Sequence, residues 1–197
     1  MLTDWPAIVP IAGRLDCANL LCIQPSGIHG VGLYSRHTFS KGQPIYKLKG
    51  TRVIADYDCN FYEGPNWVGL GWREWLIPEE ANPIIFTNHA CRPNAVISGG
   101  LAVIALRDIE VGEEIVVDYA TTEVDPFWQM QCSCRSARCR KQVRAFSYFP
   151  DATQSYYGRF LPRTFLEAAR RVRVSCCRAI QVSVIAPASL QTRRSTN

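Results

Sequence analysis

The sequence NHACRPN at residues 88–94 gathers a histidine, a cysteine and two asparagines around an arginine–proline pair, and the fold prediction is centred on it. Taken alone, the segment fits a cap, a turn or a buried histidine whose hydrogen bonds are satisfied inside the protein. Its meaning therefore depends on the motifs that lie on either side of it along the chain.

Two motifs flank that stretch, GIHGVGLY at residues 27–34 and GEEIVVDY at residues 112–119. Glycines let a backbone approach a ligand closely and adopt positive φ, so the first motif suits a loop around a small molecule, although a plain glycine turn fits equally well. Its order, G-x-x-G-x-G, is not the dinucleotide fingerprint, and no acid about 20 residues later supports that alternative. In the second motif, a tyrosine at a strand end most often serves packing.

A cysteine cluster at residues 132–139, CSCRSARC, is a strong sign of a metal site. Adjacent C-x-C cysteines form a disulfide only with strain, whereas three thiolates in so short a span suit tetrahedral zinc once a fourth ligand joins them. Cys91, in the NHACRPN segment, is the natural candidate for that ligand. The other five of the nine cysteines are expected to be ordinary small apolar residues: Cys17, Cys22, Cys59, Cys176 and Cys177.

Short β-branched segments separated by Gly, Pro and polar turns predict a mostly β fold. The predicted strands lie at 20–24, 32–35, 44–49, 95–98, 101–105 and 114–118. Residues 56–85 contain three tryptophans amid Gly and acids, and we expect an irregular insertion with at most a short helix. Those tryptophans fit either a cover for the core or a binding groove. Residues 163–172 fit a short amphipathic helix.

With 197 residues, 47% of them hydrophobic and 20% charged, the chain has the size and composition of one packed domain. No apolar run approaches the roughly 18 residues that span a bilayer, and the N-terminus lacks the order of a signal peptide, so we expect an intracellular protein without membrane contact. Residues 1–130 carry nine Lys and Arg against fifteen Asp and Glu, whereas residues 131–197 carry thirteen against two. The acidic part favours a basic partner, and the basic end fits either nucleic-acid contact or a solvated tail.

Taken in order, the four motifs resemble the SET-domain family of protein-lysine methyltransferases, over about residues 20–140. The resemblance implies a fold of small curved β-sheets with a pseudoknot, in which the segment after NHACRPN threads beneath GEEIVVDY, followed by a short C-terminal helical tail. It implies an enzyme that transfers a methyl group from S-adenosylmethionine to a protein lysine, with structural zinc in a post-SET segment. The segment 149–162 is similar to the tail of compact stand-alone members.

The resemblance also implies which residues form the sites. Tyr119 would be the catalytic residue, facing the methyl group and the target amine. Zinc would be held by Cys91, Cys132, Cys134 and Cys139. The cofactor would be bound by His29, Gly30, Gly32, Tyr34, Asn88 and His89. Val143 or Phe146 would cover the adenine face.

Three positions depart from the family pattern. Ala90 stands where a serine is frequent, Leu48 where a tyrosine is common, with Tyr46 close by, and Val117 where a phenylalanine is frequent. Fewer aromatic hydroxyls around the amine would widen the channel and permit more than one methylation. The departures at residues 90 and 48 also support an alternative, a non-catalytic SET-like module that binds a basic protein. A zinc-binding nucleic-acid module built on the basic third is a further alternative.

The expected organisation is a lead-in at 1–19, a SET domain at 20–122 with 56–85 as a variable insertion, a post-SET zinc segment at 123–146 and a basic tail at 147–197 with a disordered end. The expected partner is a basic, lysine-containing protein, with a histone tail as the first candidate. Nucleic-acid contact through the tail and a monomeric state complete the expectation.

Overall fold

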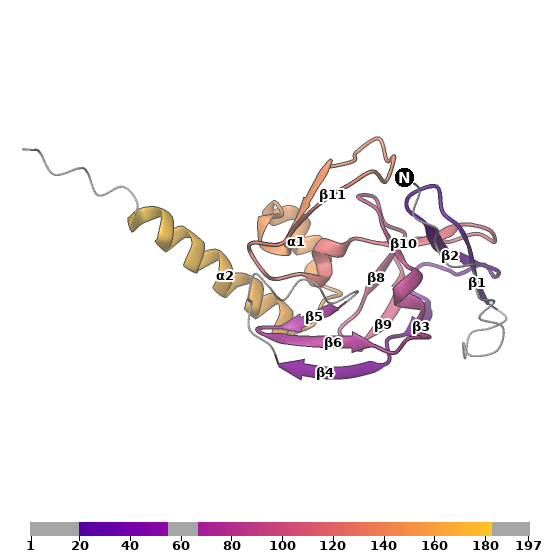
Figure 1. The fold of residues 1–197 in the computed structure, drawn as a ribbon, viewed down its shortest axis with the longest axis horizontal. Helices are drawn as coiled ribbons and strands as arrows, with labels where there is room; N and C mark the ends of the chain where they lie inside the picture. Colours follow the sequence, from indigo (N-terminus) through magenta and orange to yellow (C-terminus); the bar gives the residue numbers. More distant parts are fainter. Residues whose placement is uncertain (1–19, 55–66, 183–197) are drawn as a thin grey trace, which may run out of the picture.

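The computed structural model describes residues 20–54 and 67–182, and this part of the chain is built mainly from short strands in four small sheets (Figure 1). The first sheet has the order β1 (Leu21–Pro25), β2 (Val31–Ser35), β10 (Glu114–Val117) and β7 (Asn88–His89). The second has the order β3 (Pro44–Lys47), β9 (Ala102–Ala105) and β8 (Ala95–Ile97). The third has the order β4 (Gly50–Ile54), β6 (Glu74–Pro78) and β5 (Val68–Gly71). The fourth is the hairpin β11 (Gln129–Gln131) and β12 (Gln142–Arg144).

Helices are short except at the C-terminal end of the described chain. The 3-10 helices are η2 (Pro83–Phe86), η3 (Tyr119–Thr122) and η4 (Phe146–Tyr148), and the α-helices are α1 (Asp151–Gly158) and α2 (Arg163–Val182). The predicted mostly β fold with a helical tail is confirmed, although α2 is longer than the predicted helix at 163–172. The predictions for 1–19, for 56–66 and for the end of the tail beyond 182 lie outside the described residues.

All six predicted strands form, with their ends shifted by at most two residues. Each is a short β-branched segment bounded by turns. Most of their buried side chains, including Leu33, Val103 and Ile115, meet in one apolar cluster. The parallel pairing of β7 with β10 joins Asn88 to Val116 and His89 to Val117. This pairing brings the NHACRPN and GEEIVVDY segments side by side, as the expected pseudoknot requires.

The expectation of an irregular insertion at 56–85 is wrong for its described part. Residues 68–78 form β5 and β6, and β6 pairs along its whole length with β4, a strand that was not predicted. Trp75 is buried in this sheet whereas Trp72 is half exposed, so one of these two tryptophans covers the core. The hydrophobic side chains of β6 offset the weak strand propensity of the glycines in β5.

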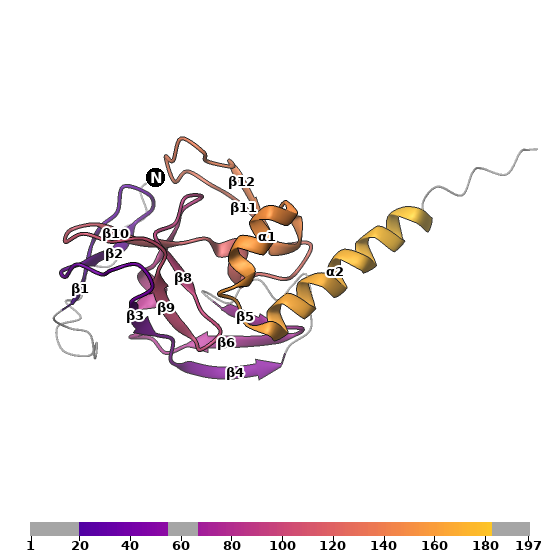
Figure 2. The same ribbon diagram turned by 180° about the vertical axis from the view of Figure 1, so that it is seen from behind.

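A second apolar cluster joins the cysteine segment to the helical tail. It contains Cys132, Val143 and Phe146 together with Phe165 and Ala168 from the first half of α2. Thr164 Oγ1 donates a hydrogen bond of 2.9 Å to the Leu70 carbonyl, which ties α2 to β5. The tail therefore begins as part of the core, and only the later turns of α2 project beyond the sheets (Figures 1 and 2). Among the described helices, none is long and apolar enough to cross a membrane.

Candidate active site and metal centre

The loop between β1 and β2 presents an open backbone surface. Its Ser26 N–H donates to the Gly30 carbonyl at 2.9 Å, and Gly30 has φ +49°, a conformation that favours glycine. No atom lies within 4 Å of the point where a Cβ on Gly27 or Gly30 would stand, and His29 is exposed. The predicted cofactor residues His29 and Gly30 thus lie at an uncovered turn with room for a ligand beside it.

Glu114, on β10, joins this loop to the rest of the site. Its carboxylate accepts hydrogen bonds from Ser26 Oγ at 2.8 Å, from Asn88 Nδ2 at 2.8 Å and from Tyr34 Oη at 3.3 Å. It lies against Gly32, where a side chain would collide with it. Burial and the charge of Glu114 raise the pKa of Tyr34. Three of the predicted cofactor residues therefore share one carboxylate that the sequence analysis did not single out.

Asn88 fastens the glycine loop from the other side. Besides its bond to Glu114, its side-chain amide donates to the carbonyls of His29 at 3.2 Å and Val31 at 3.0 Å. The amide protons are therefore engaged with the protein itself. Asn88 shapes the loop, and its remaining acceptor oxygen and main chain are the groups with which it would meet a ligand.

Tyr119 begins η3 at the end of β10, and its hydroxyl donates to the Thr87 carbonyl at 2.9 Å. Burial, reinforced by the charge of Glu114, raises the pKa of Tyr119 to about 12. Tyr46 reaches the same threonine, with its hydroxyl 2.7 Å from Thr87 Oγ1. Thr87 Oγ1 already donates to the Pro83 carbonyl at 2.9 Å, so Tyr46 is the donor in that pair. Two tyrosine hydroxyls thus converge on Thr87, while the buried Leu48 adds none.

The imidazole of His89 faces inward. Its Nδ1 accepts from the Tyr119 N–H at 3.1 Å, its Nε2 lies 3.4 Å from Cys91 Sγ, and its side chain is only 3% exposed. Burial, with a smaller contribution from the Arg140 charge, lowers the pKa of His89 to about 4, so the ring is neutral. Both ring nitrogens have protein partners, and any contact of His89 with a cofactor is left to its main chain.

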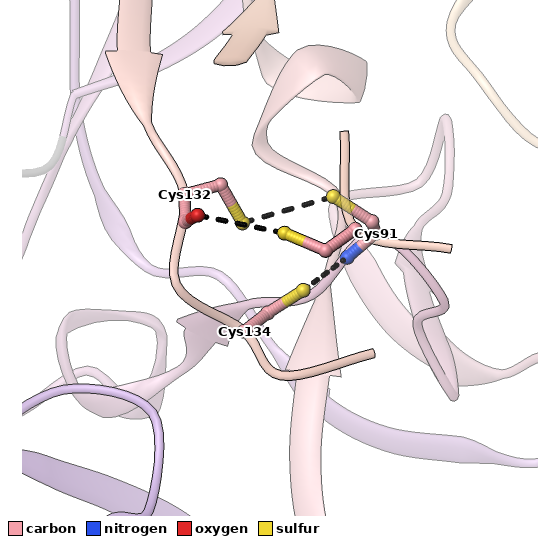
Figure 3. A group of neighbouring side chains, drawn as sticks. Cys91, Cys132 and Cys134 are labelled. Carbon is pink, nitrogen blue, oxygen red and sulfur yellow. Dashed lines mark hydrogen bonds between the residues drawn. The ribbon is translucent and has the colours of Figure 1, made fainter. Parts of the chain in front are cut away.

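Four cysteines meet at one point although Cys91 is distant in sequence from the other three. The sulfur atoms of Cys91, Cys132, Cys134 and Cys139 all lie within 4.8 Å of one another, and the Cys91–Cys132 pair is 3.7 Å apart (Figure 3). The Cys91 N–H also donates to Cys134 Sγ at 3.4 Å. These thiols are unpaired by disulfides, and their spacing lets a single ion contact all four.

Arg140 and Asp118 connect this cluster to the strand that carries Tyr119. The Arg140 guanidinium lies 2.6 Å from Asp118 Oδ1 and donates through Nε to Cys91 Sγ at 3.4 Å. It also covers the Phe149 ring, 4.9 Å from its centroid. Burial raises the pKa of Asp118, and the Arg140 charge opposes that shift.

Four residues at the site escaped the sequence analysis: Glu114, Thr87, Asp118 and Arg140. Glu114 and Asp118 lie inside the GEEIVVDY motif, but their individual contacts were not predicted, and Thr87 lies outside every motif. Arg140 follows the last cysteine of the cluster, and that adjacency was an available signal. The expectation that Val143 or Phe146 covers an adenine is not met, because both are at most 1% exposed inside the second cluster.

A glycine loop and Tyr34 share the Glu114 carboxylate, beside four cysteines that could hold a metal ion. They define the class of protein: a small-sheet β domain with an open glycine loop and a four-cysteine cluster. Comparison with known proteins identifies the family. Residues 30–120 match the family model described as the SET domain. This span, a little under half of the chain, is a SET domain.

The curated relatives that match are much longer proteins. Human histone-lysine N-methyltransferase 2B is 28% identical over 134 residues, which cover 59% of this chain and 5% of that protein. Histone-lysine N-methyltransferase trithorax of Drosophila virilis is 31% identical over 136 residues, 60% of this chain and 3% of that protein. Histone-lysine N-methyltransferase set9 of Aspergillus terreus is 31% identical over 124 residues, 59% of this chain and 19% of that protein. The chain thus spans less than a fifth of each.

Among solved structures, the crystal structure of KRYPTONITE in complex with mCHG DNA and SAH is similar to this chain with a TM-score of 0.49 and 20% identity, covering 62% of this chain and 28% of that one.

Proposed function

We propose that this protein is an S-adenosylmethionine-dependent methyltransferase that acts on the side-chain amine of a protein lysine. The observation that carries the proposal is that the β7–β10 pair joins the open glycine loop to Tyr119. Asn88 donates to the carbonyls of His29 and Val31, and the preceding Thr87 accepts the Tyr119 hydroxyl. The SET domain at residues 30–120 and the similarity to proteins named histone-lysine N-methyltransferases support methyl transfer to lysine as the reaction at this site.

The residues present fit the cofactor. Space beside Gly27 and Gly30 admits a ligand against the bare backbone, and the carboxylate of Glu114 lies behind the loop to favour a cation. His29, Gly30, Gly32, Tyr34, Asn88 and His89 would hold the cofactor, with His89 contributing its main chain. When bound, S-adenosylmethionine supplies a methyl group attached to a positively charged sulfur.

Tyr119 serves as an orienting hydroxyl in this mechanism. With its pKa at about 12, it keeps its proton at neutral pH and is a poor general base. Its bond to the Thr87 carbonyl fixes the hydroxyl, so the oxygen lone pairs can position an incoming amine.

The target lysine must arrive as the neutral amine. From a reference pKa of about 10.4, deprotonation at pH 7 costs roughly 4.6 kcal/mol, and a desolvated channel lowers that pKa because it disfavours the ammonium form. Tyr119 is partly buried, and this burial is the main cause that raises the pKa of its hydroxyl. No dedicated base is required of the chain.

We propose zinc for the four-cysteine site. Tetrahedral zinc with Zn–S bonds of about 2.3 Å places sulfurs about 3.8 Å apart, close to the 3.7 Å between Cys91 and Cys132. Four thiolates leave no position for water, so the ion would be structural and would fasten the post-SET segment at 123–146 to the NHACRPN loop. Unpaired thiols and a zinc site suit an intracellular, reducing compartment.

The proposed substrate is a basic protein, with a histone tail as the first candidate. The excess of Asp and Glu in residues 1–130 favours a lysine-rich peptide laid along the domain as an added strand. The excess of Lys and Arg in residues 131–197 fits a second contact with nucleic acid, and we propose that the protein acts as a monomer.

The test is transfer of labelled methyl from S-adenosylmethionine to mixed histones and to a lysate, followed by mass spectrometry of the labelled protein. We expect label on lysine, and products beyond monomethyl-lysine. A folded, zinc-loaded protein that binds the cofactor but labels nothing would contradict the proposal and favour a non-catalytic module that binds a basic protein.

A further inference from the structure

Cys91 is connected to the beginning of η3 by two separate chains of hydrogen bonds. Both start at its sulfur and end at consecutive backbone amides, those of Tyr119 and Ala120. A member of the four-cysteine site is therefore linked directly to the residue that we place at the reacting amine.

The first chain passes through the imidazole of His89. Because Nδ1 accepts the Tyr119 N–H at 3.1 Å, that nitrogen carries no proton, and the neutral ring must bear its proton on Nε2. Nε2 therefore donates toward Cys91 Sγ at 3.4 Å.

The second chain passes through Arg140. Its backbone N–H and its Nε both donate to Cys91 Sγ, at 3.3 Å and 3.4 Å, and its Nη2 lies 2.6 Å from Asp118 Oδ1. The same carboxylate oxygen accepts the Ala120 N–H at 3.1 Å and thereby caps η3. Arg140 directly follows Cys139, so a bound ion would fix its backbone as well as its sulfur acceptor.

We propose that Arg140 is a positioning residue that couples occupancy of the four-cysteine site to the order of η3, and so to the placement of Tyr119. This inference rests on the zinc site of the proposed function. With the ion bound, the Cys91 sulfur is held in place and both chains are complete. Without it, nothing holds the four sulfurs together, and Arg140 loses the fixed acceptor that keeps it against Asp118.

The test measures hydrogen exchange at the Ala120 amide by NMR, with zinc bound and after chelation, together with zinc content. In the wild type, chelation should speed exchange by about 10-fold or more, because opening of η3 becomes easier. In an Arg140→Gln variant that still loads zinc, the ratio of the exchange rate after chelation to the rate with zinc bound should fall several-fold. The reason is that the link between η3 and the metal is cut. Arg138→Gln is the matched control: it removes one exposed charge from the same loop, and its ratio should equal that of the wild type.

Asp118→Asn guards against the case in which Arg140→Gln cannot load zinc. It leaves an acceptor oxygen for the Ala120 N–H but removes the charge that holds Arg140, and its ratio should also fall. Wild-type ratios in both zinc-loaded variants would overturn the coupling while leaving the metal proposal intact. A wild-type protein that binds no zinc would instead refute the metal site, and this inference with it.

The coupling also predicts a kinetic signature. Zinc-loaded Arg140→Gln should bind S-adenosylmethionine as the wild type does but turn over more slowly, because η3 and not the glycine loop is loosened. An equal loss in cofactor affinity would contradict a role confined to η3.

Discussion

Thr87 holds the hydroxyl groups of both Tyr46 and Tyr119, although it belongs to none of the motifs that carry the family resemblance. The missing tyrosine at Leu48 is therefore offset in part by an aromatic hydroxyl that reaches the same region from β3. Tyr46 is buried, and its hydroxyl contacts Thr87 Oγ1.

Tyr46→Phe should destabilise the protein by about 1 kcal/mol, because Thr87 Oγ1 loses a donor in a buried place. Denaturant unfolding measures the change. Tyr156→Phe is the control, since that side chain is 42% exposed, and it should stay within about 0.5 kcal/mol of the wild type. Equal stabilities for the two variants would show that the Tyr46–Thr87 bond contributes nothing.

Glu123 gives the fold a pH dependence. Burial raises its pKa to about 7 from the model-peptide 4.5, and its Oε1 accepts the Asp125 N–H at 2.8 Å. The folded state therefore holds a proton that the unfolded state releases. The stability that this proton contributes is fully present below pH 4.5 and is lost as pH rises through 7. The linked free energy is on the order of 3 kcal/mol.

Glu123→Gln should remove that dependence, since the amide stays neutral and keeps an oxygen for Asp125. We expect the variant to gain stability relative to the wild type at pH 8 and to differ little from it at pH 5, measured by denaturant unfolding. Parallel stability curves between pH 5 and 8 would refute the assignment to Glu123.

At the scale of elements, strand β5 shows where sequence patterns mislead. Its sequence, VGLG, suggests a turn, yet Gly69 is required because the strand presses against η3. A Cβ there would lie 2.6 Å from the Thr122 carbonyl oxygen. The six predicted strands were found because β-branched residues and turns marked them, whereas the β4–β6–β5 sheet depends on close backbone approach and leaves no periodic signal.

Gly69→Ala should destabilise the fold by about 1–3 kcal/mol, because the added methyl meets backbone that cannot yield cheaply. Gly71→Ala, in the same strand, should cost less, since its nearest contact is the Thr164 side chain at 3.3 Å. Thermal unfolding of the pair measures the difference. A larger loss for Gly71→Ala would contradict the packing of β5 on η3.

At the scale of the whole molecule, the cysteine segment and the helical tail share one core. Cys132 and Cys134 pack in the same cluster as Phe165 and Ala168. Loss of an ion from the four cysteines should therefore lower the stability of the whole domain. Cys132, Cys134 and Cys139 could be selected from the sequence because their spacing is typical of a metal site, and Cys91 because it lies in the other polar motif. The roles of Glu114 and Arg140 could not be predicted, because they come from contacts between segments far apart in the chain, although the position of Arg140 beside Cys139 was a signal.

Chelation should therefore lower the melting temperature by about 5 °C or more and release one zinc ion per chain. Cys134→Ser should abolish metal content, whereas Cys22→Ser, a thiol on β1 outside the cluster, should retain it. Thermal unfolding in the presence of a metal-sensitive dye measures both the melting temperature and the amount of zinc released. A melting temperature that is the same with and without the chelator would exclude a structural role for the ion.

The most direct test of the central claim compares Tyr119→Phe with the wild type in single-turnover methyl transfer, with cofactor affinity measured alongside. We predict that the rate falls by about 100-fold or more while affinity for S-adenosylmethionine changes little, because the lost hydroxyl orients the amine and does not hold the cofactor. A variant that transfers methyl groups at the wild-type rate would contradict the placement of Tyr119 at the reacting centre.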